Sequence, residues 1–330
     1  MTGLLRVELT RLRWRRAVLV LVGAAVLVPL VILGVRTYDT RPVGDGDRAA
    51  AQQQVDVELE YIEQGIADCE QNPRNFGVDP DRAERQCARQ FGYQPQVEDY
   101  LYREQLNVAR ERSNSALAVV AIVAALMLLA GTTYVGHDWN SGSMSNQLLF
   151  EPRRLRVWLA KAVAVALVAA SVAVVGLVLF WGGLLLVAQS RDLPVPGQVV
   201  TDVVQHALRS TLAITGAAVF GYALTTLSRS TVFTIGVLFA VSVAGGLIFA
   251  LLPQSALRYE PSTNAAAVVN GRAEYWVQPP EACYGPRVPD GLDCDETKEV
   301  SVQHGTAYYA VLMLLVGGAS AASFRRRDIS

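Results

Sequence analysis

The strongest candidates for functional residues lie in one short segment, residues 136–161 (GHDWNSGSMSNQLLFEPRRLRVWLAK). It combines an aspartate, a Ser/Gly/Asn cluster, a proline and several arginines, and long apolar runs lie on both sides of it. Residues 141–145 offer several N-caps, and the apolar residues after them predict a short amphipathic helix that breaks at Pro152. The basic cluster after the proline marks the cytoplasmic end of the next span. The alternative is an ordinary positively charged membrane loop, anchored by Trp139 and Trp158.

Signatures of catalysis and nucleotide binding are missing from the sequence. No G-x-x-x-x-G-K-[ST] occurs, and neither of the only two lysines, Lys161 and Lys298, follows a glycine, so the chain is not expected to bind ATP in the P-loop manner. The motifs that an intramembrane hydrolase would need, H-E-x-x-H, G-x-S-x-G or paired aspartates within the spans, are missing too. We therefore expect no enzymatic activity, no metal and no cofactor.

The four cysteines are the remaining reactive side chains, and disulfide formation is the chemistry that they favour. Cys69 and Cys87 lie in one polar segment, and Cys283 and Cys294 lie in another. Pairing within each segment is the natural arrangement, although four cysteines allow three connectivities and pairing across the segments stays open. A metal site is disfavoured because no C-x-x-C or nearby histidine cluster supports it.

The elements that must position these residues are predicted to be membrane-spanning helices. The chain of 330 residues is 52% hydrophobic and 18% charged, which is too apolar for an average soluble domain. Apolar runs of about 18 residues or more are the signature of membrane helices. Six such runs occur, at residues 17–35, 116–135, 162–188, 207–227, 231–252 and 305–324. The sequence thus predicts an all-α polytopic membrane protein with six transmembrane helices.

The distribution of charge predicts the orientation of these helices. The net charge of −1 says little, but residues 1–16, the central loop 136–161 and the tail 325–330 are basic, whereas the long segments 36–115 and 253–304 are acidic. Positive residues stay on the cytoplasmic side of a membrane, so both termini are predicted to be cytoplasmic. We expect a multi-pass protein of the plasma membrane, with all four cysteines outside the cell.

The ionisable residues closest to the spans lie at their ends. Arg209 lies near the outer end of the fourth span, where it can snorkel, and Lys161 lies near the inner end of the third. A proton- or ion-coupled carrier normally needs ionisable groups at the midpoint of the membrane. The sequence therefore argues against such a carrier.

The connecting segments differ in their expected structure. Residues 1–16 read as a basic interfacial helix at the cytoplasmic surface. In the extracellular insertion 36–115, helices are expected at 48–69, after the Asp79-Pro80 start signal, and at 97–112. The outer loop 189–206 and the tight cytoplasmic turn 228–230 are short. The proline-rich segment 253–304 is expected to be extended and turn structure held by its two cysteines, and its aromatics favour an outer-leaflet anchor over a recognition surface.

The central loop resembles the cytoplasmic loop of ABC-2 type transporter permeases. That loop has a Gly and an acidic residue before Gly-Thr, then a Leu pair, Pro, Arg and a Lys that opens the next helix. An aspartate replaces the usual glutamate at 138, and a serine replaces the usual threonine at 143. The resemblance extends through the order of spans to the closing FRRRDI, but the loop is its only motif-like part. The matching positions are Gly136, Asp138, Gly142, Ser143, Leu148, Leu149, Pro152, Arg154 and Lys161.

This resemblance implies the transmembrane permease subunit of an ABC transporter. It also implies three partners: a separate ATP-binding subunit, a second identical or paralogous permease half, and membrane lipid. ATP is bound by the partner subunit, the direction is export, the transported substrate is unknown and no nucleic acid is involved. The loop is then the coupling element that contacts the ATPase. The residues expected at that contact are Asp138, Ser143, Glu151, Arg153 and Arg154.

A second hypothesis is a stand-alone membrane receptor or assembly factor. Its working part would be the ectodomain that carries the cysteines, and it would tolerate charge reversal in the central loop. A membrane enzyme is a third hypothesis, and it lacks a catalytic constellation.

Overall fold

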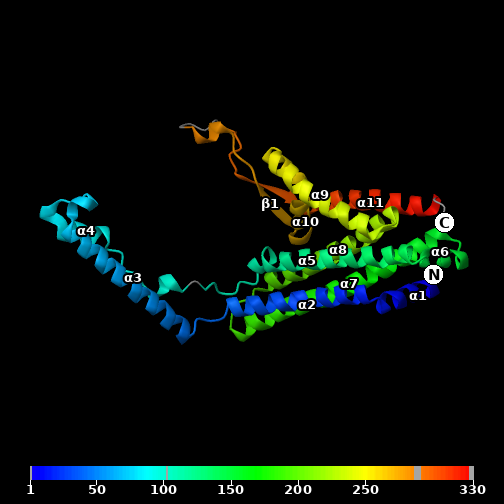
Figure 1. Ribbon diagram of the computed structural model, residues 1–330, viewed down its shortest axis with the longest axis horizontal. Helices are drawn as coiled ribbons and strands as arrows, with labels where there is room; N and C mark the ends of the chain where they lie inside the picture. Colours follow the sequence, from blue (N-terminus) through cyan, green and yellow to red (C-terminus); the bar gives the residue numbers. More distant parts are fainter. Residues whose placement is uncertain (1, 102, 286–290, 327–330) are drawn as a thin grey trace. The chain divides into compact units, whose positions relative to one another are not determined.

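The computed structural model describes residues 2–101, 103–285 and 291–326, and within them almost all regular structure is helical (Figure 1). The chain divides into two compact units, which we describe separately. Unit 1 comprises Met1–Val35 and Asn107–Ser330, and unit 2 comprises Arg36–Leu106. The predicted tail 325–330 lies outside the described residues from 327 onward.

Among the described residues, six helices are long and apolar enough to cross a membrane, and they confirm the six apolar runs. Their lengths range from 21 to 37 residues. At 1.5 Å per residue, even the shortest reaches across a hydrocarbon core of about 30 Å. These helices are α2 (Arg16–Asp39), α5 (Ser115–Asn140), α7 (Arg154–Ser190), α8 (Gly197–Ser228), α9 (Thr231–Leu251) and α11 (Val302–Arg326).

Helix α8 is the centre of unit 1, because α5, α7 and α11 all pack against it. Its contact with α5 is backbone against backbone. A Cβ added at Gly221 would lie 2.4 Å from the carbonyl oxygen of Leu128, and one added at Gly131 would lie 2.2 Å from that of Ala218. Small residues allow such close approach between membrane helices, where apolar burial gives no net drive for association. The two glycines therefore set the distance between α5 and α8.

Two short helices lie at the end of unit 1 where both termini are found (Figure 1). Helix α1 (Thr2–Trp14) is separated from α2 by a break at Arg15. Helix α6 (Ser143–Phe150) starts after Gly142, which has a φ of 68°, and ends before Pro152. The predicted short helix of the central loop is confirmed. The interfacial position of α1 stays a prediction.

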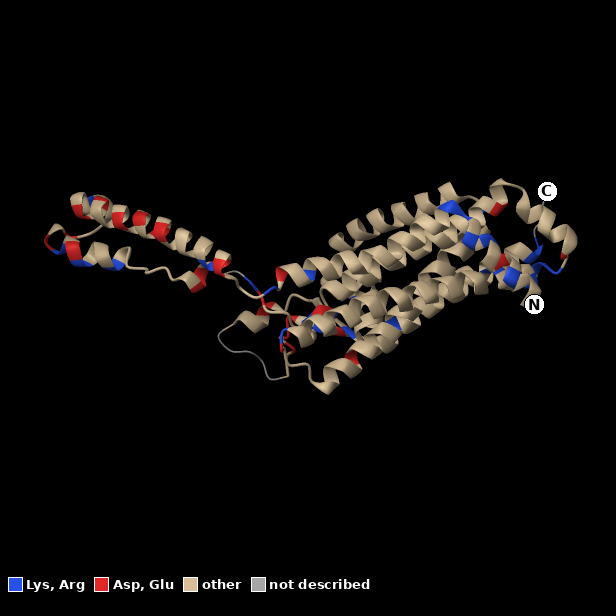
Figure 2. Ribbon diagram, turned by 90° about the horizontal axis from the view of Figure 1, so that it is seen from below, with Lys and Arg blue, Asp and Glu red and all other residues tan. Residues whose placement is uncertain are grey.

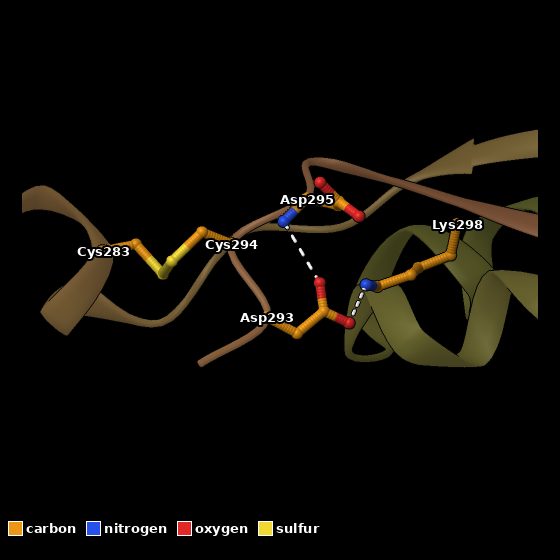
Figure 3. Close-up of a disulfide and its surroundings, with 5 residues drawn as sticks. All are labelled: Cys283, Asp293, Cys294, Asp295 and Lys298. Atoms are coloured by element: carbon orange, nitrogen blue, oxygen red, sulfur yellow. Dashed lines mark hydrogen bonds and ion pairs between the residues drawn. A yellow bond between two sulfur atoms is a disulfide. The ribbon is translucent and has the colours of Figure 1, made fainter. Parts of the chain in front are cut away.

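The segment between α9 and α11 contains a helix and a small β-hairpin. Strand β1 (Arg272–Trp276) pairs antiparallel with β2 (Thr297–Ser301), with Glu274 opposite Glu299. The disulfide Cys283–Cys294 closes the connection between the strands, where Lys298 and the backbone N–H of Asp295 both donate to Asp293 (Figure 3). This part confirms the predicted extended structure, and 3₁₀ turns cover Gln254–Tyr259 and Glu281–Tyr284.

The prediction of extended structure was wrong for residues 261–270, which form helix α10 (Pro261–Asn270). Pro261 occupies the first helical turn and Gly271, with a φ of 93°, follows the last. Proline at the start and glycine just past the end are the ordinary signals of a helix. The density of prolines in the surrounding segment obscured them.

Unit 2 is a disulfide-bonded helical hairpin. Helix α3 (Asp45–Gln71) is joined to α4 (Ala83–Gln90) by the disulfide Cys69–Cys87, and Phe76 and Phe91 pack against the buried sulfurs. The 3₁₀ turns Pro73–Phe76 and Pro80–Arg82 lie between the helices, and the side chain of Asp79 accepts a hydrogen bond from the backbone N–H of Asp81. The predicted first helix, start signal and disulfide are confirmed.

The helix predicted at residues 97–112 does not form. Among the described residues of this range, which leave out residue 102, the regular structure is limited to the 3₁₀ turns Val97–Tyr100 and Arg110–Arg112. The Oδ1 of Asn107 accepts hydrogen bonds from the backbone N–H groups of Ala109 and Arg110. Asparagine side chains that bond the following backbone compete with helix formation, which explains the break.

A salt bridge closes the base of α3 in unit 2. The guanidinium of Arg103 donates two hydrogen bonds to the carboxylate of Asp47, and the backbone N–H of Gly44 donates a third, at 3.0 Å. Hydrogen bonding to Arg103, together with that backbone N–H, lowers the pKa of Asp47 to about 2. The charged form of Asp47 is thus favoured by folding.

Substitution of Gly221 by alanine should force α5 and α8 apart, because its Cβ would overlap the Leu128 carbonyl oxygen. We expect a loss of about 1–3 kcal/mol in the free energy of unfolding, measured by thermal unfolding in detergent. Gly216→Ala on the same helix is the matched control, since nothing lies within 4 Å of a Cβ there. An equal effect of both substitutions would contradict the close crossing.

The stabilisation from Asp47 should depend on pH in a defined direction. Its folded pKa lies below the unfolded value, so the contribution is complete above about pH 4 and is lost as the pH falls toward about 2. Thermal unfolding of the wild type and Asp47→Asn should therefore differ at pH 5 and converge as the pH falls below about 2. Glu63→Gln, which removes an exposed carboxylate of the same helix, is the control. A difference between the wild type and Asp47→Asn that is as large at pH 2 as at pH 5 would refute the assignment.

Candidate functional site

A cluster of buried charged side chains lies where α1, α5, α6 and α7 meet, at the end of unit 1 that holds both termini. In Figure 2 the long helices of unit 1 are free of charged residues over most of their length, and acidic and basic residues gather at this end. We call this group the ionic cluster. Its members are Glu8, Arg15, Tyr134, Asp138, Ser143, Gln147 and Lys161.

Lys161 is the centre of the ionic cluster. Its Nζ donates hydrogen bonds to Oε2 of Glu8 at 2.9 Å and to Oδ2 of Asp138 at 2.6 Å, and all three side chains are 0% exposed. Burial of an isolated charge costs several kcal/mol, so each carboxylate here depends on a cation in direct contact. Lys161 is therefore the bridge between the N-terminal helix α1 and the span α5.

Arg15 supplies the second positive charge. It lies in the break between α1 and α2, and its guanidinium donates to the carboxylate of Asp138 and to the backbone carbonyl of Tyr134. The same guanidinium lies 4.9 Å from the centre of the Tyr134 ring. With two carboxylates and two cations, the cluster is formally neutral, which makes its burial physically possible.

Neutral side chains saturate the remaining acceptors of the cluster. The hydroxyl of Tyr134 and the amide of Gln147 both donate to Glu8, and the hydroxyl of Ser143 donates to Asp138 at 3.3 Å. Arg11, at the rim, donates to the amide oxygen of Gln147 at 3.2 Å. Since a buried polar network is stable only when its members are satisfied, these bonds hold α6 in a defined place.

Helical spacing brings these residues together. Tyr134 and Asp138 are four residues apart on α5, and Ser143 and Gln147 are four apart on α6. Residues with this separation share one face of a helix. On the N-terminal segment, Glu8 and Arg11 are three apart, so both face the same neighbours. Helical spacing thus explains which residues of one helix lie together, and the contacts between helices depend on long-range packing.

The structure separates the five residues that were predicted to contact a partner. Asp138 and Ser143 belong to the ionic cluster, and the side chain of Asp138 is fully buried. Glu151, Arg153 and Arg154 lie at the connection between α6 and α7, where Oε1 of Glu151 accepts from the backbone N–H of Arg153 at 3.3 Å and Arg154 donates to the carbonyl of Arg325 at 3.5 Å. Asp138 is therefore inside the protein and Ser143 is partly buried, and contact of either with a partner stays a prediction that the burial of Asp138 does not favour.

Sequence reasoning did not find Glu8, Arg15, Tyr134 or Gln147 as members of a site. One signal was available, because Glu8 is the only acidic residue among five arginines in the N-terminal segment. A single carboxylate on a basic helix, and a single lysine at the start of a span, are complementary. Their separation of 153 residues hid the pairing.

The apolar tip of α6 is the exposed part of this region. Leu149 and Phe150, the last residues of the helix, are 81% and 91% exposed. The other end of α6 is fixed by Ser143, Met144 and Gln147, of which the last two are buried. A rigid short helix therefore presents two large apolar side chains beside basic residues.

The ionic cluster joins four helices through charged hydrogen bonds. The central charges of the cluster are inaccessible to a ligand, and in the described parts of the chain no group of three or more His, Cys, Asp or Glu side chains could hold a metal ion. Comparisons of the chain with protein-family models, with curated proteins and with solved structures gave no match. Function must therefore be inferred from the geometry itself.

Removal of Lys161 should test the cluster. In Lys161→Met, Glu8 loses its closest cation while it stays buried, so we expect a loss of about 3–5 kcal/mol in the free energy of unfolding. Thermal unfolding in detergent measures it. Lys298→Met, which removes the other lysine of the chain from a partly exposed pair, should cost at most about 1 kcal/mol.

A double substitution distinguishes charge imbalance from lost packing. Glu8→Gln combined with Lys161→Met removes the uncompensated carboxylate, so this double variant should be more stable than Lys161→Met alone. A double variant that is no better than the single one would mean that the buried pair carries no electrostatic coupling.

Proposed function

We propose that this chain is the membrane-spanning permease subunit of an ABC-2 type transporter, an exporter driven by a separate ATP-binding subunit. The observation that carries the proposal is the short helix α6. It connects the spanning helices α5 and α7, is fixed at one end by the ionic cluster, and exposes Leu149 and Phe150 at the other. An element that is rigidly held and apolar at its tip is suited to transmit motion from a bound partner.

The contacts of α6 define what would move with it. Gln147 bonds Glu8 of α1, and Ser143 bonds Asp138 of α5, which in turn bonds Lys161 of α7. Force on the tip of α6 would therefore reach three other helices through charged hydrogen bonds. In this proposal Asp138 is a positioning residue, and Glu151, Arg153 and Arg154 are the charged rim of the contact.

The surface at the tip of α6 has the composition of a protein interface. Large apolar side chains contribute most of the binding free energy when a partner buries them, and a charged rim steers association. Leu149 and Phe150 form such a core, and the exposed Arg153 and Arg156 follow it in sequence. An ATPase subunit with an apolar groove and an acidic margin would complement this surface.

The positive-inside rule supports a cytoplasmic location for α1, α6 and both termini. Arginines cluster around this end, including those of the N-terminal helix, the central loop and the turn between α8 and α9. The two disulfides lie in the segments that this topology places outside the plasma membrane, where oxidation is permitted. A second permease half and membrane lipid would cover the apolar faces of α2, α9 and α11, which are little buried in the single chain.

A stand-alone receptor or assembly factor is the competing function, and the separate fold of unit 2 favours it. Unit 2 has its own disulfide and core and could act as a docking module. Such a protein would not need a defined partner at α6. Substitutions at the tip of that helix therefore discriminate between the two functions.

Replacement of both Leu149 and Phe150 by aspartate should abolish binding of the ATPase. We expect affinity purification of the chain from native membranes to recover a soluble protein with Walker motifs, and the variant to recover at least about tenfold less of it, since hot-spot residues contribute 2 kcal/mol or more. Mass spectrometry identifies and quantifies the co-purified ATPase.

Tyr284→Asp is the matched control, because Tyr284 is 65% exposed and lies in the segment between α9 and α11. It should retain the ATPase at the wild-type level. Recovery of no Walker-motif protein, or equal recovery with the α6 variant, would contradict the transporter function and leave the receptor function in its place.

A further inference from the structure

A second polar group lies on α8, away from the ionic cluster. Asp202, His206 and Arg209 are spaced by four and three residues, so they share one face of this helix. Nothing in the proposed coupling uses them. We examined whether this face could hold a ligand.

The position of Arg209 along α8 indicates its depth in a membrane. Twenty residues separate it from Arg229, which ends α8 in a left-handed conformation with a φ of 60°. At 1.5 Å per residue this distance is about 30 Å, which equals the thickness of the hydrocarbon core. If Arg229 marks the cytoplasmic boundary, the Cα of Arg209 therefore lies at the opposite boundary.

The guanidinium of Arg209 has no anionic partner in the described residues. It makes no hydrogen bond or ion pair there, and the one carboxylate on its face of α8, that of Asp202, pairs with Arg112 at 3.1 Å. Arginine presents five N–H donors in a fork that matches the oxygens of a phosphate. A half-buried guanidinium without a partner at this depth is therefore unsatisfied in the protein alone.

The end of α10 is shaped around this guanidinium. Gly271 follows α10 with a φ of 93°, and a Cβ at this position would lie 2.4 Å from Nη1 of Arg209. Only glycine combines this backbone conformation with such a close approach. The backbone of Gly271 therefore forms one side of the place that Arg209 occupies.

Two further donors without acceptors lie near this face of α8. His206 is 2% exposed and its Nε2 has no partner, and Trp181 of α7 is 3% exposed and its Nε1 has none. Their rings are 5.4 Å apart. The hydroxyl of Ser210 lies 3.4 Å from Nδ1 of His206, and when this hydroxyl donates to Nδ1, Nε2 carries the proton. Arginine, histidine and tryptophan then form a set of donors that lacks an acceptor.

We propose that this region, the Arg209 site, binds the phosphate of a lipid headgroup in the leaflet opposite to both termini. Arg209 forms the bidentate contact, and His206 supplies a second hydrogen bond, directly or through a water molecule. The headgroup depth of the Arg209 Cα favours a membrane lipid over a soluble ligand. Such a lipid would fix α10 and the hairpin against α8 on the outer side of the membrane.

Binding to the purified full-length chain in a neutral detergent tests this proposal. The probes are phosphatidylglycerol, diacylglycerol with the same acyl chains, and inorganic phosphate, and thermal unfolding is followed against the concentration of each. We expect phosphatidylglycerol to stabilise the wild type and diacylglycerol to have no comparable effect. Arg209→Gln should weaken the apparent affinity for phosphatidylglycerol by about tenfold or more, as for loss of a charged hydrogen bond.

Arg258→Gln is the matched control, because Arg258 is an exposed arginine of the segment that also contains α10. It should bind phosphatidylglycerol like the wild type. Arg209→Lys keeps the charge without the fork, so its apparent affinity for phosphatidylglycerol should fall between those of the wild type and Arg209→Gln. This variant still tests the site if the glutamine substitution impairs folding.

Three outcomes would overturn the proposal: equal binding of phosphatidylglycerol by wild type and Arg209→Gln, equal stabilisation by diacylglycerol, or stabilisation by inorganic phosphate alone. The last result would show a site for a soluble anion instead of a lipid. No ATPase is present in this experiment, so its failure leaves the proposed permease function intact, and failure of the ATPase experiment leaves the Arg209 site intact.

Discussion

Neutralisation of two buried carboxylates is the constraint on which the arrangement of unit 1 depends. Glu8 and Asp138 come from elements far apart in the chain, and one ammonium group, that of Lys161, contacts both. Because an apolar bundle cannot hold either charge alone, the N-terminal helix must lie where this lysine can reach it. The position of α6 follows from the same requirement, since its glutamine and serine complete the hydrogen bonds of these carboxylates.

The membrane helices could be predicted from sequence because their signal is local and strong. A run of about 20 apolar residues has few alternatives to a spanning helix, and all six runs were recovered. The disulfides could also be predicted from sequence, since each joins cysteines of one segment. By contrast, α10 was missed although its capping signals were present, and the helix predicted at 97–112 is interrupted at Asn107, whose side chain bonds the backbone that follows it.

The candidate site was only partly visible in the sequence. The central loop drew attention to Asp138 and Ser143, but Asp138 pairs with Arg15, which lies 123 residues away between α1 and α2, and with Lys161 of α7. Pairing across such distances depends on helix packing, which hydrophobic periodicity does not specify. The exposure of the α6 tip could also have been predicted from sequence. Leu149 and Phe150 are large apolar residues shortly before a proline at a membrane surface, where no neighbouring element is expected to bury them.

The position of the two disulfides has a consequence for how the protein is made. Each joins cysteines that are close in sequence, separated by 18 residues in one case and by 11 in the other. On the proposed topology, each bond can close as soon as its own segment has crossed the membrane, before later spans have been inserted. Biogenesis would then need a thiol oxidase on the outer side of the membrane, but no isomerase to correct pairing between the two segments.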